Sequence, residues 1–303
     1  MDNSIYDELK KLAGSQNVLT DEPMRKHVTF RTGGNADYFV TACSEEALSE
    51  IICYLRREQI PYYVIGNGSN LLFEDRGYRG VVVKIGRFSD DIKVSGNLVT
   101  AGAGVLLSQA AAAAYEHSLT GMEFAAGIPG TVGGAVVMNA GAYGGEIKDI
   151  IVSARVMDEK GEIVTLTREQ LTLGYRHSIV SDSGKGLIVV EAEFRLCAGD
   201  KAAIRLQMDD LARKRREKQP LEYPSAGSTF KRPEGYFAGK LIQDAGLKGL
   251  SCGGAQVSEK HSGFVVNKGN ATTEDILELV KKVQDTVYDK FGVMLEMEVK
   301  VVR

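Results

Sequence analysis

The segment GMEFAAGIPGTVGGAVVMNAGAYGGE, Gly121 to Glu146, is one of two glycine-rich loops that follow strand-like runs in the chain. The other is VIGNGSNLLFED, Val64 to Asp75. Loops of this kind bring backbone amides close to phosphate oxygens, because glycine allows a positive φ angle and carries no Cβ. Each loop alone is also typical of tight turns in a compact α+β domain, but the two together favour a site for an extended dinucleotide with a pyrophosphate.

Neither loop matches a common nucleotide-binding fingerprint. The run Gly66-Asn67-Gly68-Ser69-Asn70 would need a third glycine where Leu71 stands, and no acidic residue follows at the expected distance. The pattern G-x-x-x-x-G-K-[ST] is absent from the sequence. The sequence therefore argues against a Rossmann domain and against a P-loop nucleotide triphosphate fold.

Length and charge narrow the class of protein. A chain of 303 residues with 44% hydrophobic content can bury a large core, and its length predicts two domains. The net charge of −3 provides no field for nucleic acid or for an anionic membrane, so we expect neither as a partner. A small phosphorylated ligand would need a local cluster of cations.

The cysteines and the apolar runs predict a cytoplasmic protein without a metal. Cys43, Cys53, Cys197 and Cys252 are scattered, with no CxxC pair and no neighbouring histidine ligands, which argues against zinc and against a disulfide framework. No apolar run approaches the roughly twenty residues that cross a bilayer. The N-terminus, MDNSIYDELKKLAG, is amphipathic and unlike a signal peptide.

Short β-type runs punctuated by glycine dominate the chain from about Thr29 to Leu196, and they indicate an α+β domain. These runs are DYFVTA, YYVIG, GVVVKI, NLVTAGAG and LIVVEAEFRL. A helix is predicted for SEEALSEIICYLRREQ, with Ser44 as its N-cap and an apolar face of Leu48, Ile51, Ile52 and Leu55. An alanine-rich helix is predicted for LLSQAAAAAYEHSL, which can pack closely against a sheet or a ligand.

A smaller domain is predicted to follow a basic helical segment near Leu206 to Lys218. That segment ends at Pro220, which places a domain boundary near Lys218. A later helix is predicted over residues 273–291, with a capping box at its start and Gly292 at its end. The closing VMLEMEVKVV alternates as a strand does, with Glu296, Glu298 and Lys300 on one face and Leu295, Met297, Val299 and Val301 on the other.

The stretch SAGSTFKRP, Ser225 to Pro233, raises a chemical question about Ser228. A nucleophilic serine needs a base, usually a histidine, and the sequence before Ser228 has none nearer than His177. The residues AGSTF also do not match the G-x-S-x-G nucleophile elbow. A hydrolase is therefore disfavoured, and a loop serine that satisfies a turn remains the simple alternative.

Several long motifs, in order and over nearly the whole chain, resemble those of the UDP-N-acetylenolpyruvoylglucosamine reductases of peptidoglycan precursor synthesis. The motifs are RTGGNADYF, VIGNGSNLL, AGIPGTVGGAVVMNAGAYG, GYRHS, AGSTFKRPEGYFAGKLIQDAGLKG and EVKVV. The uninterrupted run from Gly235 to Asn267 is similar to the shorter, type II variant of the family, which lacks a segment carrying a lid tyrosine.

The resemblance implies a fold and a division into domains. It implies a flavin-binding domain of the vanillyl-alcohol-oxidase (PCMH) type over residues 1–200, with lobes at about 1–80 and 81–200. The C-terminal strand, residues 293–303, is expected to complete the first lobe. Residues 219–292 are expected to form a smaller α/β substrate-binding domain, which agrees with the boundary near Lys218.

The resemblance also implies a reaction in which Ser228 donates a proton. In this family NADPH reduces non-covalently bound FAD, the flavin passes a hydride to the outer carbon of the enolpyruvyl ether, and the neighbouring carbon receives a proton. Ser228 matches the proton donor, Arg176 the arginine that polarises the substrate carboxylate, and Glu298 the glutamate on its other side, which is thought to act protonated. A serine hydroxyl is a weak acid in water, so this donor needs the developing charge to be stabilised by its neighbours.

Further positions follow from the same resemblance. Tyr175 and Lys218 match residues near the substrate's diphosphate and sugar, and the basic run 213–218 can supply the local cations. Arg232 stands where some relatives carry an asparagine that contacts the substrate, and an arginine there could meet a phosphate. The flavin is expected at Arg31, Thr32 and Gly33, at Gly66, Asn67, Gly68, Ser69 and Asn70, and at Gly127, Ile128, Pro129, Gly130, Thr131, Gly133 and Gly134. Ile128, Ala135 and the alanine-rich helix could line the slot for the isoalloxazine ring.

Two alternatives have the same fold. An FAD-dependent oxidase would return electrons to dioxygen, and many such enzymes tether the flavin through a histidine, but neither glycine loop contains one. A catalytically silent protein that binds nucleotide sugars would not need Arg176, Ser228 and Glu298 together. We therefore expect a monomeric NADPH-dependent reductase that acts on a small molecule.

Overall fold

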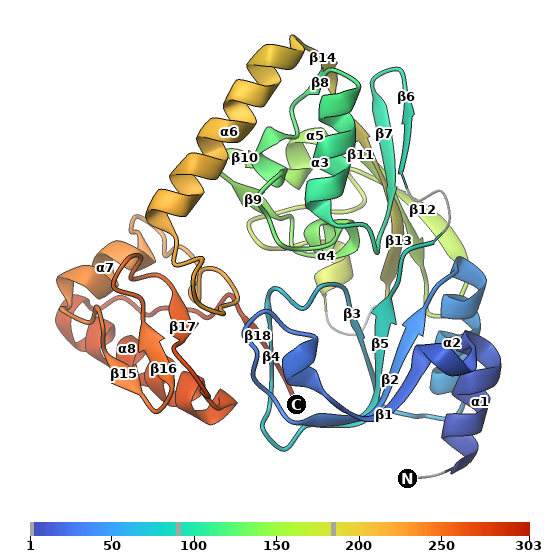
Figure 1. Cartoon of the computed structure of the whole chain (residues 1–303), viewed down its shortest axis with the longest axis horizontal. Coiled ribbons are helices and arrows are strands. Elements are labelled where there is room, and N and C mark those ends of the chain that lie inside the picture. The colour runs from blue at the N-terminus through green and yellow to red at the C-terminus, as the bar shows by residue number, and fades with distance from the viewer. Residues whose placement is uncertain (1–2, 89–91, 183–185) are drawn as a thin grey trace. The chain divides into compact units, whose positions relative to one another are not determined.

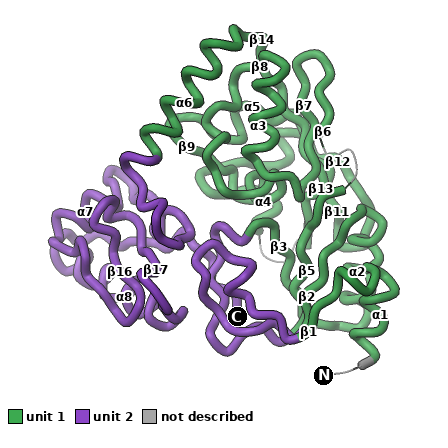
Figure 2. Tube along the Cα trace, viewed as in Figure 1, with its two compact units in different colours: residues 1–20, 38–67, 80–215 green, residues 21–37, 68–79, 216–303 purple. Residues whose placement is uncertain are grey.

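The computed structural model describes residues 3–88, 92–182 and 186–303 (Figure 1). The chain forms two compact units, which Figure 2 distinguishes by colour. Unit 1 comprises residues 1–20, 38–67 and 80–215, and unit 2 comprises residues 21–37, 68–79 and 216–303. The first glycine-rich loop is therefore divided between the units at Gly68. The finer division into lobes and a substrate domain that the sequence predicts stays a prediction.

Unit 1 is built from mixed and antiparallel sheets flanked by helices, although residues 21–23, 35–37 and 78–79 at the ends of three of its strands belong to unit 2. One sheet has the strand order β1-β2-β5-β3 and contains the parallel pair β3–β5, and the other is an antiparallel sheet of order β12-β11-β13-β7-β6. Short antiparallel pairs, β8–β14 and β9–β10, lie outside these sheets. The strands are β1 (Val18–Pro23), β2 (Asn35–Ala42), β3 (Tyr62–Ile65), β5 (Tyr78–Ile85), β6 (Ile92–Ser95), β7 (Leu98–Gly102), β8 (Leu119–Thr120), β9 (Gly141–Ala142), β10 (Gly145–Glu146), β11 (Ile151–Met157), β12 (Ile163–Thr167), β13 (Ile188–Arg195) and β14 (Cys197–Ala198).

The helices of unit 1 confirm the predicted segments, with one difference in length. In α2, the Ser44 hydroxyl accepts a hydrogen bond from the Ala47 amide at 3.1 Å, and the predicted apolar face is buried. The basic helix α6 begins at Lys201, earlier than predicted, because the Asp200 carboxylate accepts a hydrogen bond from the Ala203 amide and caps its first turn. The helices are α1 (Asn3–Ala13), α2 (Glu45–Arg57), α3 (Leu107–Glu116), α4 (Val132–Val137), α5 (Ile147–Ile150) and α6 (Lys201–Lys218), with 3-10 turns η1 (Ser15–Asn17), η3 (Glu123–Ala125) and η4 (Ile179–Ser181).

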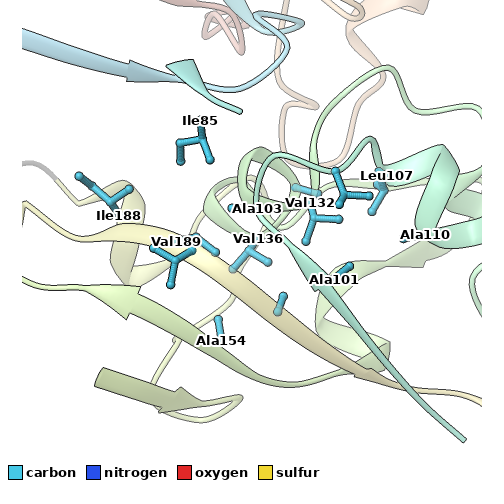
Figure 3. Close-up of a cluster of buried hydrophobic side chains, with 14 of the residues drawn as sticks. Ile85, Ala101, Ala103, Leu107, Ala110, Val132, Val136, Ala154, Ile188 and Val189 are labelled. Carbon is cyan, nitrogen blue, oxygen red and sulfur yellow. The ribbon is translucent and has the colours of Figure 1, made fainter. Parts of the chain in front are cut away.

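Small side chains allow α4 to pack closely on the antiparallel sheet of unit 1. Figure 3 shows Val132 and Val136 of α4 in one cluster with Ala101 of β7, Ala154 of β11 and Val189 of β13, and all five are at most 2% exposed. Because α4 lies inside the second glycine-rich loop and directly follows Gly127 to Thr131, this packing anchors that part of the loop to the core.

Unit 2 contains the C-terminal part of the chain together with two N-terminal segments. An antiparallel sheet of order β15-β16-β17 packs with α8, and β18 pairs in parallel with β4, with Lys300 opposite Leu71. The predicted helix 273–291 is confirmed with its ends, because Thr272 and Asp275 form the capping box and Gly292 ends the helix at a φ of 66°. The elements are η2 (Met24–Lys26), β4 (Leu71–Phe73), α7 (Ala238–Asp244), β15 (Ser251–Cys252), β16 (Ala255–Val257), β17 (Val265–Asn267), α8 (Thr273–Phe291) and β18 (Lys300–Val302).

The predicted C-terminal strand is shorter than the alternating pattern of residues 293–302 indicates. Only Lys300–Val302 belongs to β18, and Met297 forms an isolated antiparallel bridge with Phe230. Glu298 and Val299 are both buried, at 8% and 4% exposure, so the alternation of buried and exposed side chains breaks there. The reason is that this segment changes partner, from residues 229–231 to β4, within a few residues.

A buried asparagine ties an N-terminal segment of unit 2 to its sheet. Asn267, 6% exposed, donates to the Phe30 carbonyl at 3.1 Å and accepts from the Gly269 and Ala271 amides at 3.0 and 3.1 Å. The substitution Asn267→Ala would orphan these groups, so we expect it to lower the free energy of unfolding by about 2–4 kcal/mol in urea titrations. Asn270→Gly is the control, because Asn270 is exposed at a φ of 55°, where glycine is unstrained, and stability should not fall. Equal stability of Asn267→Ala and the wild type would contradict this account.

Candidate active site

The two glycine-rich loops meet within unit 1. The Asn67 side-chain amide donates to the Pro129 carbonyl at 2.6 Å. A Cβ built on Gly66 would lie 2.2 Å from Oγ1 of Thr131, so only glycine permits this approach. The structure thus brings together two segments that the sequence separates by some sixty residues, as a shared ligand site would require.

The segment 127–134 is fixed to the core by hydrogen bonds, and some of its residues are exposed to solvent. The Thr131 hydroxyl caps α4 by accepting from the Gly134 amide at 3.4 Å, and the Gly133 amide donates to the Ala103 carbonyl at 3.0 Å. Thr131 and Gly133 are buried, whereas Gly127, Pro129 and Gly134 are exposed. The exposed backbone at Gly127 is accessible to a ligand, whereas the Gly134 amide already donates to the Thr131 hydroxyl.

Arg215 of α6 lies beside this loop. Its Cδ and Nη1 atoms would both be 3.1 Å from a Cβ on Gly127. Burial lowers the pKa of the Arg215 guanidinium from its ordinary value. The group nevertheless keeps its charge, because arginine stays protonated in proteins. The sequence analysis included Arg215 only as part of a basic run. The charge pattern of the sequence does not show which cation of α6 lies beside Gly127, because that depends on how the helix packs.

Several alanines of the alanine-rich helix pack into the core of unit 1, and the predicted slot for the isoalloxazine ring stays a prediction. Ala110, Ala111 and Ala114 of α3, and Ala135 of α4, are at most 2% exposed and belong to the core of unit 1. Their small size serves close helix packing, whereas Ala112 of the same helix is exposed and Ala113 is partly exposed. Of the residues proposed for the slot, Ile128 is partly exposed.

Tyr175 and Arg176 occupy the tip of a tight turn in unit 1. Gly174 and His177 exchange backbone hydrogen bonds at 3.0 and 3.3 Å, and Arg176 adopts a φ of 55°, in the left-handed region. The Arg176 guanidinium lies over the Tyr175 ring, with Cζ 5.1 Å from the ring centroid, and its Nη2 donates to the Gly141 carbonyl at 3.4 Å. A non-glycine residue in this conformation is uncommon and is found more often at functional sites.

Asn139 supports this turn and was missed by the sequence analysis. It is fully buried with a φ of 44°, and its amide donates to the Gly174 carbonyl at 2.8 Å and to Glu146 Oε2 at 2.7 Å. Its side-chain oxygen accepts from the Lys148 amide at 2.8 Å. The motif MNAGAYG contained the residue, but nothing local indicates that its amide reaches the turn of Arg176.

In unit 2, a turn closed by a hydrogen bond from the Arg31 amide to the Val28 carbonyl at 3.1 Å leads into residues 32–34, where glycine is required. Gly33 has a φ of 101°, and a Cβ on it would lie 2.8 Å from Cβ of Phe73. Arg31 is exposed at a φ of 57°, whereas the Thr32 side chain is buried and its Oγ1 accepts from the Thr273 hydroxyl of α8 at 3.4 Å. Arg31 is therefore the side chain of this turn that can meet an anion.

Hydrogen bonds link this turn's neighbours to the Ser228 loop and to Glu298, all within unit 2. The Thr29 amide donates to the Gly68 carbonyl at 3.2 Å, and the Thr29 hydroxyl donates to the Ser225 carbonyl at 2.6 Å. The Asn70 amide donates to the Glu298 carbonyl at 3.1 Å.

The connection closes at Thr229, whose carbonyl accepts from the Glu298 amide at 2.9 Å. Thr229 is itself buried, at 1% exposure, and its hydroxyl accepts from the Val265 amide at 2.9 Å. Together with the chain segments 68–70 and 225–229, these hydrogen bonds form a closed ring through Thr29, Gly68, Asn70, Glu298, Thr229 and Ser225, to which we refer as the loop ring. It brings a predicted flavin segment, the predicted proton donor's loop and the predicted glutamate into one structure.

Ser228 lies on the loop ring between Gly227 and Thr229. It is partly buried, and in the described part of the chain its hydroxyl makes no hydrogen bond, to a histidine or to any other group. This arrangement leaves the hydroxyl available to a ligand but gives it no base, which supports the argument against a nucleophilic serine.

The remaining predicted substrate residues of unit 2 are on its surface. Lys218 is exposed at the end of α6. Arg232 is exposed, its Cζ lies 4.0 Å from the centroid of the Phe237 ring, and its Nε donates to the Tyr236 carbonyl at 3.4 Å. These cations are therefore accessible to an anion in solution.

Comparison with known proteins decides the family. Residues 36–167 match the family model of an FAD binding domain, and residues 219–302 match that of the UDP-N-acetylenolpyruvoylglucosamine reductase C-terminal domain. The chain is 55% identical to the UDP-N-acetylenolpyruvoylglucosamine reductase of Agathobacter rectalis, over 99% of this chain and 97% of that protein. It is 51% identical to the reductase of Clostridioides difficile, over 98% and 97% of the two chains. The chain belongs to the UDP-N-acetylenolpyruvoylglucosamine reductase family.

The solved structures agree with this assignment. The crystal structure of the reductase from Thermus caldophilus superposes with a TM-score of 0.80 at 35% identity, over 94% of this chain and 98% of that one. p-Cresol methylhydroxylase, 16% identical with a TM-score of 0.52 over 97% of this chain and 65% of that one, shares the fold alone. The predicted fold class, a PCMH-type flavin domain with a second α/β region, is confirmed.

Two further findings apply to the reductase chain. Among residues 3–88, 92–182 and 186–303, no three His, Cys, Asp or Glu side chains are grouped to hold a metal ion. In the same ranges no helix is both long and apolar enough to cross a membrane.

Proposed function

We propose that this chain reduces the enolpyruvyl ether of UDP-N-acetylglucosamine enolpyruvate to UDP-N-acetylmuramate with NADPH and FAD, in peptidoglycan precursor synthesis. The observation that carries the proposal is membership of the reductase family over 99% of the chain. The roles of individual residues below are part of the proposal.

The glycine loops fit a bound FAD. Gly66 and Gly68 have no room for a Cβ, and Gly127 leaves open backbone, which is how a pyrophosphate is approached by amides. Arg31 and Arg215 add cations near such amides, within their respective units. When bound, FAD supplies a hydride taken from NADPH to the outer carbon of the enolpyruvyl group.

Ser228 completes the reduction by donating a proton to the carbon that bears the ether oxygen. Hydride and proton together saturate the carbon–carbon double bond, so NADPH, one proton and the substrate give NADP⁺ and the saturated lactyl ether. A hydroxyl without an internal hydrogen bond can align with the substrate carbon, and solvent can return the lost proton.

Arg176 and Glu298 stabilise the charge that develops before the proton arrives. Hydride addition pushes electrons toward the substrate carboxylate, and a guanidinium can hold that carboxylate with two parallel hydrogen bonds. Glu298 is held by its backbone in the loop ring and takes the other side. Tyr175, Lys218 and Arg232 are proposed to contact the sugar and diphosphate, and the two cations are exposed for this purpose.

The function is tested by following the flavin absorbance without oxygen. The purified protein is reduced with NADPH, and UDP-N-acetylglucosamine enolpyruvate is then added. Prompt reoxidation with formation of UDP-N-acetylmuramate is expected. Reoxidation by air but not by the substrate would indicate an oxidase, and a protein without a flavin band would contradict the assignment of the glycine loops.

The substitution Arg176→Lys tests the role of the guanidinium. It keeps the charge but loses the bidentate grip, so we expect kcat/KM for the enolpyruvyl substrate to fall about 30-fold, whereas reduction by NADPH stays near the wild-type rate. His177→Ala is the control in the same turn, because His177 Nε2 is 2.7 Å from Asp182 and has no assigned role. A lysine variant with wild-type kcat/KM would remove Arg176 from the mechanism.

A further inference from the structure

We propose that Asn70, the last residue of the first glycine-rich loop's GNGSN run, is a positioning residue for Glu298. The proposal rests on the proposed function, because it assigns Asn70 to the half-reaction in which Glu298 takes part. Asn70 would thus join the flavin loop mechanically to the group that stabilises charge on the substrate.

The backbone of Glu298 is held by hydrogen bonds on both sides. Its carbonyl accepts from Nδ2 of Asn70 at 3.1 Å, and its amide donates to the Thr229 carbonyl at 2.9 Å. Two residues later, the Lys300 amide donates to the Asn70 carbonyl at 3.0 Å. Asn70 therefore contacts the segment 298–300 through both its side chain and its backbone.

The Asn70 side chain supplies a hydrogen bond to the Glu298 carbonyl, which lies just before the pairing of β18 with β4 begins. The parallel pairing of β18 with β4 begins at Lys300, opposite Leu71, so the carbonyl of Glu298 lies outside that ladder. Glu298 is only 8% exposed as a residue, its carbonyl takes part in a part-buried hydrogen bond, and a carbonyl withdrawn from water needs a donor. The Asn70 amide supplies it, and this bond fixes the peptide that follows Glu298.

Loss of this donor should move the Glu298 carboxyl rather than unfold the protein. The β18–β4 pairing and the bond to Thr229 would remain, but the peptide between Glu298 and Val299 could rotate. A misplacement of about 1 Å in a catalytic group can slow a reaction by roughly 100-fold. A small displacement of the Glu298 carboxyl is therefore expected to slow the half-reaction in which the substrate reoxidises the flavin.

Asn67 in the same run provides a matched comparison. It has the same side chain and lies three residues earlier, but its amide donates to the Pro129 carbonyl of the second glycine loop. The two asparagines thus separate a contact that shapes the flavin loops from a contact to Glu298.

The first experiment measures the two half-reactions of Asn70→Ala by stopped-flow absorbance. Because Asn70 also belongs to the predicted flavin segment, both rates are measured per bound flavin. We expect reoxidation by UDP-N-acetylglucosamine enolpyruvate to slow about 30-fold, with reduction by NADPH within roughly threefold of the wild type. Asn70→Asp keeps the side chain's size but cannot donate to the carbonyl, so it should be impaired as strongly. In Asn67→Ala, any loss should fall on flavin content or on both half-reactions to a similar degree.

A double-mutant cycle with Glu298→Ala shows whether Asn70 acts through the glutamate. If it does, adding Asn70→Ala to Glu298→Ala should slow reoxidation by less than about threefold, although the same change costs about 30-fold in the wild type. Additive losses, or equal slowing of both half-reactions by Asn70→Ala, would overturn the positioning role. A wild-type protein that NADPH reduces and the substrate does not reoxidise would overturn the proposed function, and with it this inference.

Discussion

Ser228→Ala is expected to slow reoxidation of the flavin by the enolpyruvyl substrate about 1000-fold, in the range typical of a lost general acid. Reduction by NADPH should be unchanged, because that half-reaction needs no proton at the substrate carbon. The side chain is partly buried and makes no internal hydrogen bond in the described ranges, so its removal should cost little stability.

Anaerobic stopped-flow measurements of both half-reactions test this expectation. Ser225→Ala is the matched control, because it removes a hydroxyl from the same loop and keeps the carbonyl that accepts from Thr29. A solvent-deuterium experiment adds a second readout, since the proton delivered by Ser228 comes ultimately from solvent. Unchanged reoxidation in Ser228→Ala would leave the serine without a catalytic role and would favour direct proton transfer from water.

Gly68→Ala is expected to weaken FAD binding about 100-fold or more and to destabilise the protein. Gly68 has a φ of 61°, and its Cβ would lie 2.1 Å from the carbonyl oxygen of His27, a backbone atom that cannot move aside alone. The strained φ and the overlap together cost about 3–4 kcal/mol. We expect the free loop to move to relieve this strain, so that FAD binding must restore the strained position, and each 1.4 kcal/mol that it restores corresponds to tenfold in affinity. Flavin content after purification and fluorescence titration with FAD measure the effect.

Gly96→Ala separates the conformational cost of a positive φ from the cost of steric overlap. Gly96 lies between β6 and β7 at a φ of 58°, with nothing within 4 Å of the Cβ position, so it has the conformational cost without the overlap. We expect it to lose about 1 kcal/mol of stability and to keep its flavin. Similar flavin loss in both variants would mean that general destabilisation, rather than the shape of the loop, controls the cofactor.

Local elements of this protein could be predicted because their signals are local. The N-cap of α2 at Ser44 and both ends of α8 follow from side chains within a turn of the helix end. The apolar face of α2 follows from spacing alone. The early start of α6 was missed, although Asp200 carried a cap signal.

Long-range packing decided the features that the sequence analysis got wrong or missed. The alanines of α3 could have faced a ligand or a core, and packing on the sheet makes Ala110, Ala111 and Ala114 core residues while Ala112 stays exposed. Residues 293–302 alternate like one strand, but their pairing passes from the Ser228 loop to β4, so Glu298 is buried. Asn139 reaches the turn of Arg176 across 35 positions of sequence.

The sequence by itself determined the family, the fold class and the residue types of the candidate site, because long motifs and periodic patterns are properties of neighbouring residues. Only the tertiary structure decided which loops meet. Asn70 and Glu298 are 228 positions apart, and no local pattern encodes a hydrogen bond between them. That bond exists because β4 and β18 pair in one register, and the register follows from the burial of the whole unit around it.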